Sequence, residues 1–310
     1  MTSTQCARND RISTESRVGS SAVKYPQPFV KWAGGKAQLI SRISRLVPRN
    51  FECYFEPFIG GGALFFHQEP ERSLISDANF ELINVYRVIK DHPGSLMDEL
   101  TNIQHKRISA SLFKRYRDLD PEILSPTKRA ARFIFLNKTC FNGLYRVNRS
   151  GFFNVPFGKY HRMPRLYDKD NIVAVQKLLK NADIMCASYE IPLDRAKKGD
   201  FVYLDPPYSP EPEALGFTSY TKESFSAADQ KRLAQRFKEL DRRGCLVMLS
   251  NSNTKLVREL YAEYQTNIFE LTADRMINCI GSERRGYSEL VVLNYVPPVE
   301  TLIPWVKQSG

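Results

Sequence analysis

Short apolar runs alternate with amphipathic segments near the amino end of the chain. The elements predicted there are, in order, a helix from Lys36 to Pro48, a strand at 53–56, a helix from Ala63, a strand that ends at Asp77 and a helix with Asp77 or Asn79 near its cap. Two Gly-rich turns, in PFVKWAGGKAQLI and ECYFEPFIGGGALFFHQ, precede the first two helices. This β-α-β-α order is how a doubly wound sheet begins.

The same rhythm returns in the last third of the chain. The predicted elements are a helix at 171–181, strands at 184–188 and 200–205, a helix at 226–240, a strand at 244–250, a helix at 254–262 and strands at 265–271 and 288–295. The two ends of the chain therefore predict one α/β domain.

The middle of the chain has a different pattern. Residues 95–138 are predicted to be helical with breaks near Pro121 and Pro126, and LYRVNRSGFFNVPFG then alternates around an Arg-Ser-Gly turn like a β-hairpin. We therefore predict an α/β domain at 25–92 and 169–300 and a helical and hairpin domain inserted at 93–168. Residues 1–24, rich in Ser, Thr and Arg, are predicted to be a mobile polar leader.

The positive charge of the chain lies almost wholly in that inserted block. The 310 residues carry a net charge of +11, and between Thr101 and Asp170 there are fifteen basic and five acidic side chains. The other residues carry thirty basic against twenty-nine acidic side chains. Such a block is typical of a surface that binds a polyanion, although a solvated helix face is the alternative.

Composition also excludes several classes. No apolar run approaches the roughly 18 residues of a membrane span, and the first residues have no stretch fit for a secretory signal, so we expect a cytoplasmic protein. The cysteines are scattered without a close pair, which indicates neither a disulfide framework nor a zinc site. They lie at positions 6, 53, 140, 186, 245 and 279.

The most specific local motif is Asp205-Pro206-Pro207-Tyr208, directly after the apolar strand Phe201-Val202-Tyr203-Leu204. In an open α/β sheet, ligands bind outside the carboxyl ends of the strands. The Asp205 carboxylate and a rigid carbonyl beside it could accept both hydrogens of an amino group on an aromatic ring, and Tyr208 could stack on that ring. The alternative is a Pro-Pro turn in which Asp205 makes an Asx turn.

The glycines at 60–62 indicate a second half of the site. Glycine at a strand-to-helix turn allows a ligand to approach the backbone closely. The sequence matches neither GxGxxG nor a Walker motif, so a nucleoside cofactor without phosphates fits better. Asp77 is placed to accept hydrogen bonds from ribose hydroxyls, or else it caps a helix. Trp32 and Lys36 flank the other Gly pair, where a buried Trp and a helix-end Lys are the ordinary alternatives.

Taken together, these motifs resemble the Dam-type (D12 class) adenine-specific DNA methyltransferases. The resemblance runs in order from about Pro28 to Tyr295, and the motifs that carry it are PFVKWAGGK, YFEPFIGGG, SDAN, LNKTCFNGLYRVNRSGFFNVPFGKY, DPPY, LSNSN and RRGYSELVVLNY. It implies a Rossmann-like S-adenosylmethionine-dependent methyltransferase fold, in which the inserted block is the target-recognition domain.

The resemblance also implies roles for individual residues of the catalytic domain. Asp205, Pro206 and Tyr208 match the catalytic acid, the carbonyl acceptor and the ring that stacks on an extruded adenine. The positions that match cofactor contacts are Trp32, Lys36, Glu56, Phe58, Gly60, Asp77 and Asp205. No metal and no cysteine nucleophile is expected.

Nine positions of the inserted block and the amino-terminal segment match DNA contacts of enzymes that act on GATC. These are Lys31, Phe141, Asn142, Leu144, Arg146, Asn154, Pro156, Lys159 and Tyr160. Arg146 is expected to read guanine in the major groove, with a phosphate contact or a turn role as the alternative for Arg146 and Asn142. Phe141 stands where those enzymes carry Tyr, and Lys159 where they carry Arg, so the recognition sequence is less secure than the reaction.

The implied reaction is methyl transfer from S-adenosylmethionine to the N6 amino group of adenine in double-stranded DNA, within GATC or a related short site, by base flipping. A monomer is expected, with a restriction endonuclease on a separate chain as a possible partner. Two alternatives stay open at this point. One is the same fold acting on the amino group of cytosine, which the intact Asp205 disfavours, and the other is a DNA-binding protein without turnover.

Overall fold

The computed structural model describes residues 25–34, 36, 39–148, 150–207, 225–273 and 287–298. The predicted leader at 1–24 and the predicted catalytic Tyr208 lie outside the described residues.

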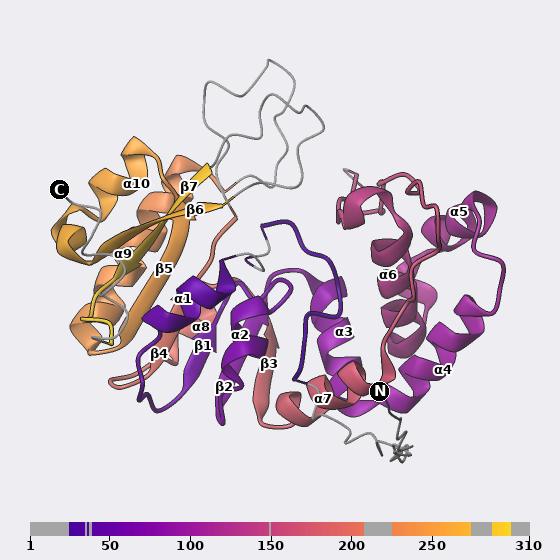
Figure 1. Cartoon of the computed structure of the whole chain (residues 1–310), viewed down its shortest axis with the longest axis horizontal. Coiled ribbons are helices and arrows are strands. Elements are labelled where there is room, and N and C mark those ends of the chain that lie inside the picture. Colours follow the sequence, from indigo (N-terminus) through magenta and orange to yellow (C-terminus); the bar gives the residue numbers. More distant parts are fainter. Residues whose placement is uncertain are drawn as a thin grey trace, which may run out of the picture.

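One seven-stranded sheet forms the centre of the described chain (Figure 1). Its strand order is β3-β2-β1-β4-β5-β7-β6, and β7 runs antiparallel to both of its neighbours while the other strands are parallel. The strands are β1 Tyr54–Glu56, β2 Ser73–Asp77, β3 Ala182–Cys186, β4 Phe201–Leu204, β5 Leu246–Ser252, β6 Ile268–Ala273 and β7 Tyr287–Leu293. The predicted doubly wound, Rossmann-like fold is confirmed. The strand order reverses between β1 and β4, and this reversal places a ligand crevice at their carboxyl ends.

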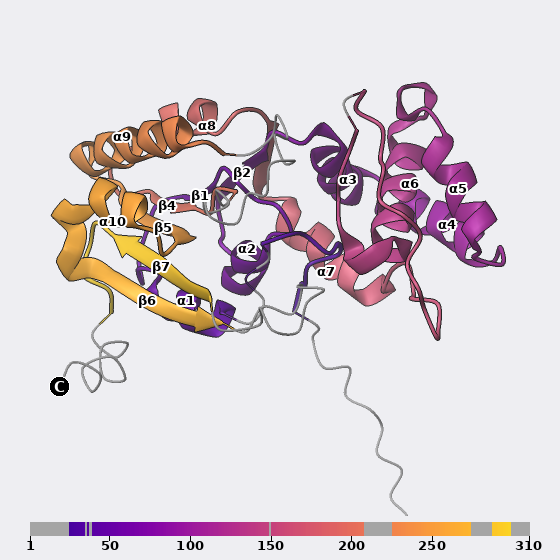
Figure 2. The same cartoon turned by 90° about the horizontal axis from the view of Figure 1, so that it is seen from above.

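Helices cover both faces of this sheet because neighbouring strand residues point to opposite sides. On β4, Phe201 and Tyr203 pack into one apolar cluster, whereas Val202 and Leu204 pack into the other. The helices on the first side are α1 Ile40–Leu46, α2 Ala63–Gln68, α3 Phe80–Asp91 and α7 Lys169–Leu179. Those on the second side are α8 Glu190–Asp194, α9 Ala227–Arg243 and α10 Lys255–Leu260 (Figure 2).

The basic block forms a helical layer beside α3. Its elements are α4 Pro93–Gln104, α5 Ala110–Asp118, η1 Pro121–Ile123, α6 Pro126–Thr139 and η2 Phe141–Gly143 (Figure 1). The two prolines predicted as breaks are the first residues of η1 and α6, where a missing N–H costs nothing. Phe133 on α6 and Leu82 on α3 belong to one continuous apolar cluster, so this layer packs firmly on the α/β part of the chain.

The predicted β-hairpin is present after η2. Val147 and Phe153 form an antiparallel bridge, and the Asn154 N–H donates to the Arg146 carbonyl at 3.0 Å. The turn lies between these two pairs, where the Gly151 N–H donates to the Asn148 carbonyl at 3.0 Å. The hairpin therefore holds Arg146 opposite Asn154.

Two element boundaries differ from the sequence prediction. Strand β3 begins at Ala182 rather than 184 and ends at Cys186. Most of its side chains are only partly buried, so its apolar run does not mark its ends, and pairing of Ala182 with Ser73 on β2 sets its start. The first helix begins at Ile40 rather than Lys36. Lys36 lies before it because its side chain turns toward Asp205.

The antiparallel strand β7 is fixed to β5 by one side chain just after its end. The Asn294 Oδ1 accepts the Val247 N–H at 2.7 Å, and its Nδ2 donates to the Asp241 carboxylate and the Cys245 carbonyl, both at 2.8 Å. Asn294→Ala removes all three hydrogen bonds and should lower the free energy of unfolding in urea by about 2 kcal/mol. The exposed Asn102→Ala on α4 is the control, and an equal effect of both changes would contradict the assignment.

Candidate active site

Three loops meet where β1, β2 and β4 end. The loop after β1 carries Phe58 and Gly60, β2 ends at Asp77, and β4 is followed by Asp205 and Pro206. Because the carboxyl ends of parallel strands share one edge of a sheet, residues far apart in the sequence meet there.

A buried ion pair lies at the end of β4. The Lys36 Nζ is 2.8 Å from Oδ1 and 3.1 Å from Oδ2 of Asp205, and it also donates to the Gly34 carbonyl at 3.0 Å. The Lys36 side chain is 4% exposed and that of Asp205 is 17% exposed. Burial raises the pKa of Asp205 above its usual range, and the adjacent Lys36 ammonium opposes that rise. The structure thus brings together two residues that the sequence indicated separately.

Glu56 lies deeper, at the end of β1. Its side chain is buried, and its Oε2 accepts a hydrogen bond from the Tyr54 hydroxyl at 2.7 Å. Burial raises the pKa of Glu56 well above the ordinary value, with a further contribution from the nearby Asp205 carboxylate. Its expected contact with the cofactor stays a prediction.

The Gly-rich turn is tied to the end of β2. The Gly60 N–H donates to Asp77 Oδ2 at 3.1 Å, and the Asn79 N–H donates to Oδ1 at 2.9 Å. Burial raises the pKa of Asp77, and these backbone donors oppose that rise. Asn79, rather than Asp77, caps α3, because its side chain accepts the Leu82 N–H.

Aromatic rings flank this turn on two sides. Phe58 stacks on Tyr189, with ring centroids 5.1 Å apart. Trp32 lies directly over Gly60, where an added Cβ would come within 2.6 Å of its Cδ1 atom, and φ there is +46°. Only glycine therefore fits under the indole. The same indole stacks on Tyr145 of the inserted layer, with centroids 5.5 Å apart and planes 23° apart.

The predicted DNA contacts gather around η2 and the hairpin. Arg146 is exposed, and its Nε donates to Asn154 Oδ1 at 2.8 Å. Phe141 is 39% exposed, and its N–H donates to the carbonyl of the exposed Pro156 at 2.9 Å. Asn142 adopts a left-handed conformation with φ 54°.

The remaining four predicted DNA contacts border this group. Lys31 and Lys159 are exposed, whereas Leu144 is partly buried. The Tyr160 hydroxyl lies 2.7 Å from the Cys140 carbonyl and 3.1 Å from the Lys138 carbonyl, so this ring is anchored to the end of α6.

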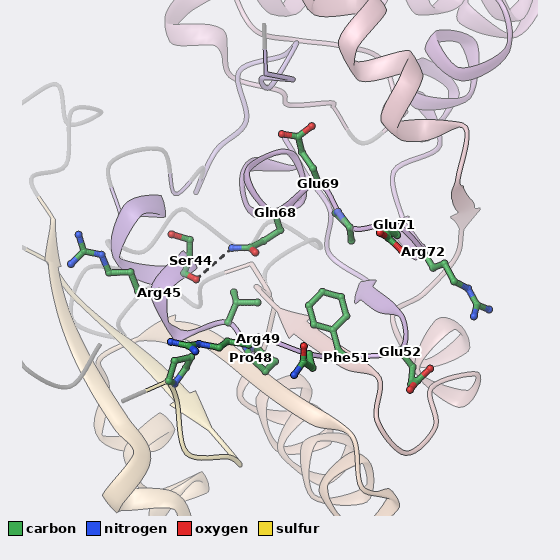
Figure 3. Close-up of a pocket in the computed structure, with 14 residues that line it drawn as sticks. Ser44, Arg45, Pro48, Arg49, Phe51, Glu52, Gln68, Glu69, Glu71 and Arg72 are labelled. Atoms are coloured by element: carbon green, nitrogen blue, oxygen red, sulfur yellow. Dashed lines mark hydrogen bonds between the residues drawn. The ribbon is translucent and has the colours of Figure 1, made fainter. Parts of the chain in front are cut away.

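A large hollow lies elsewhere and is not this site. It measures about 900 Å³ and is lined by residues such as Arg49, Glu52 and Arg72, which precede β1 and β2 (Figure 3). It therefore opens at the amino ends of these strands, opposite to the edge where ligands bind in such sheets.

Several residues near the site carried no signal of their own in the sequence. Tyr145 and Tyr189 stack on Trp32 and Phe58, and the Tyr86 hydroxyl donates to the Gly60 carbonyl at 3.0 Å. Asn137 links Lys31 to Gly143. Tyr145 and Asn137 lie inside the long motif between 136 and 160, so the motif marked the segment but not their contacts.

Comparison with known proteins decides the family. The model of the D12 class N6 adenine-specific DNA methyltransferases matches residues 32–277. The chain belongs to this family. The methyltransferase is 45% identical over 274 residues to the type II methyltransferase M1.LlaDCHI of Lactococcus lactis subsp. cremoris, covering 87% of this chain and 95% of that one.

Two further relatives cover nearly their whole length. The methyltransferase is 43% identical to the type II methyltransferase M.MjaIII of Methanocaldococcus jannaschii, covering 87% of this chain and 99% of the relative. It is 32% identical to the DNA adenine methylase of Escherichia coli K12, covering 89% and 98%. The resemblance inferred from the motifs is confirmed, and family membership implies a DNA substrate and S-adenosylmethionine as methyl donor.

The residues at the ends of β1 and β2 fit such a nucleoside cofactor. Each oxygen of Asp77 accepts one backbone N–H, which leaves a lone pair on each for a hydroxyl group of a ribose. Phe58 and Trp32 supply apolar faces on either side. Among the described residues, no group of three or more His, Cys, Asp and Glu side chains could hold a metal ion, and no described helix is long and apolar enough to cross a membrane.

Glu56→Gln should change stability in a pH-dependent way. The folded protein keeps a proton on buried Glu56 that the unfolded chain releases above about pH 4.3, so stability is lost as pH rises from the unfolded pKa toward the raised folded pKa. Glutamine keeps the Tyr54 hydrogen bond without this titration. The variant should melt at a higher temperature than the wild type at about pH 8, with a gap that narrows toward about pH 4.

Thermal melts across this pH range measure the effect, with the exposed Glu52→Gln as control. A gap that stays constant with pH would argue against a protonated, buried Glu56.

Proposed function

We propose that this methyltransferase transfers the methyl group of S-adenosylmethionine to the N6 amino group of adenine in double-stranded DNA, within GATC or a related short site, on a base rotated out of the helix. The observation that carries the proposal is Asp205, a mostly buried carboxylate at the end of β4, beside the Gly60 turn and paired with Lys36. Rotation of the base is needed because an amino group inside the duplex cannot reach a donor in such a crevice.

Asp205 and Pro206 would orient the base. The carboxylate accepts one amino hydrogen and the Pro206 carbonyl the other, which frees the nitrogen lone pair for attack. Lys36 favours the charged form of Asp205, since its ammonium opposes the rise in pKa that burial causes. Tyr208 is proposed to stack on the base.

The cofactor would lie between the ends of β1, β2 and β4, held by Trp32, Lys36, Glu56, Phe58, Gly60, Asp77 and Asp205. Bound there, it supplies an electrophilic methyl group on a sulfonium centre. Trp32 and Phe58 exclude water from the crevice, while Asp77 would accept hydrogen bonds from the ribose.

DNA would lie across η2, the hairpin and Lys31. The net charge of +10 between Thr101 and Asp170 favours a polyanion, and most of it would contact phosphates in a salt-dependent way. Arg146 is oriented for reading a base because Asn154 holds its Nε, leaving the end of the guanidinium exposed. We propose residues 93–168 as the target-recognition domain, with Phe141, Asn142, Leu144, Pro156, Lys159 and Tyr160 as the other DNA contacts there.

The biological setting follows the relatives with the higher identity. The two relatives above 40% identity are both named type II methyltransferases. We therefore propose a modification enzyme of a restriction–modification pair that acts as a monomer, with its endonuclease on a separate chain.

Asp205→Asn tests the proposed chemistry. The amide keeps the size of the side chain but presents an NH2 group in place of one acceptor oxygen, so methylation should fall about a hundredfold or more. Plasmid DNA from a methylation-free host that expresses each variant is sequenced by a method that maps methyladenine, and this also gives the recognition site.

Asp183→Asn is the matched control, because Asp183 is an exposed carboxylate on β3 paired with Arg195. The proposal requires the control to methylate like the wild type. Absence of methyladenine with the wild type would rule out the enzyme function, whereas an active Asp205→Asn variant would rule out the site alone.

Arg146→Ala tests the recognition surface. Loss of a bidentate contact to guanine should reduce discrimination at one position by about 1–3 kcal/mol, measured as kcat/KM on the mapped site and on single-base variants of it. Lys159→Ala should instead weaken all sequences by a similar factor. Equal losses on all sequences for Arg146→Ala would show that this side chain contacts phosphate.

A further inference from the structure

Asn137 lies in the last turn of α6 between the two proposed binding surfaces. Its side chain is 1% exposed, and all its hydrogen bonds go to backbone. Oδ1 accepts the Lys31 N–H at 2.9 Å, while Nδ2 donates to the Lys31 carbonyl at 2.8 Å and to the Gly143 carbonyl at 3.0 Å. One amide therefore holds two chain segments that are more than a hundred residues apart.

The first of these segments leads directly to the proposed cofactor site. Residue 32 follows Lys31, and its indole covers Gly60 so closely that a Cβ there would come within 2.6 Å of it. Any shift of Trp32 as the cofactor binds must therefore move the backbone that Asn137 holds.

The second segment leads to the proposed DNA contacts. Gly143 has φ +67°, and a Cβ there would come within 2.4 Å of the Lys31 Cδ, so the two segments are in close contact. Asn142 precedes Gly143, and Tyr145 two residues later stacks on Trp32. The link between the two segments is thus made twice, by the Asn137 amide and by the stacked rings.

We propose that Asn137 is a positioning residue that couples cofactor binding to DNA recognition. This inference rests on the proposed function. Moving one segment without the other leaves a buried carbonyl without its donor, which is unfavourable, so the two segments move together. By linkage, the cofactor then raises the affinity for the target site by the same factor by which the target site raises the affinity for the cofactor.

The chain contains a matched control for this residue. Asn171, buried near the start of α7, holds Gln27 by the same pair of backbone hydrogen bonds, at 2.8 Å to its N–H and 3.0 Å to its carbonyl. Asn171 holds the same amino-terminal segment four residues before Lys31, but it makes no hydrogen bond to the recognition loop. A change at Asn171 thus measures the stability effect alone.

The test compares Asn137→Asp with Asn171→Asp. Each change keeps the acceptor for an N–H and removes the donors to carbonyls. The affinity of S-adenosylhomocysteine is measured with and without a duplex carrying the mapped site, and the affinity of that duplex with and without S-adenosylhomocysteine. The ratio is the coupling factor, and direct loss of a contact to either ligand cancels in it.

We expect the wild type and Asn171→Asp to share a coupling factor in the range of about 5- to 150-fold. Asn137→Asp should bring this factor close to one, although both variants melt at lower temperatures. An unchanged factor in Asn137→Asp, or a wild type without coupling, would refute the proposal while methylation by the wild type still supports the function. A wild type without methylation would refute both.

A second pair of variants keeps the test independent of folding at position 137. Tyr145→Leu removes the ring that stacks on Trp32 and should also reduce the coupling factor severalfold. Tyr116→Leu is its control, because this ring packs on Phe135 on the other side of α6. Equal coupling factors for these two variants would likewise count against the link.

Discussion

The ion pair between Lys36 and Asp205 is the contact on which the arrangement of the site depends. It joins the amino-terminal segment to the end of β4, 169 residues away. Lys36 also lies 3.8 Å from Glu289 on β7, so one buried ammonium faces carboxylates from two strands. A buried charge is costly unless it is paired, and this ties the position of the segment to the sheet. Trp32 and Lys31 are placed where they are because Lys36 is fixed four residues later.

The division of charge follows the division of labour. The α/β part is nearly neutral and encloses a few buried carboxylates whose pKa values are raised by burial, which suits orientation of one small group in a crevice. The inserted layer carries the positive charge on exposed side chains, which suits long-range attraction of DNA. The two parts share one apolar cluster across α3 and α6, so they form a continuous body.

Much of this could be predicted from the sequence because the informative residues sit at strand ends. Asp77 and Asp205 follow apolar strands, and the strand and helix rhythm placed them at one edge of the sheet. The pairing of Lys36 with Asp205 was not predicted, since nothing local in either motif shows a contact across 169 residues. The same holds for the stacking of Tyr145 on Trp32 and for the bridge made by Asn137. Helix α8 was missed because five residues are too few to show a period.

The adjacency of Lys31 and Trp32 limits how such enzymes can change their target. A recognition hairpin is an obvious unit to exchange between relatives, since it is short and lies at one side of the fold. Here its base is packed against a dipeptide whose second member covers the Gly60 turn. A transplanted hairpin that lacks a suitable ring at position 145 would alter the cofactor pocket as well as the target. New specificity is therefore reached more readily by substitutions at the hairpin surface than by exchange of the whole unit.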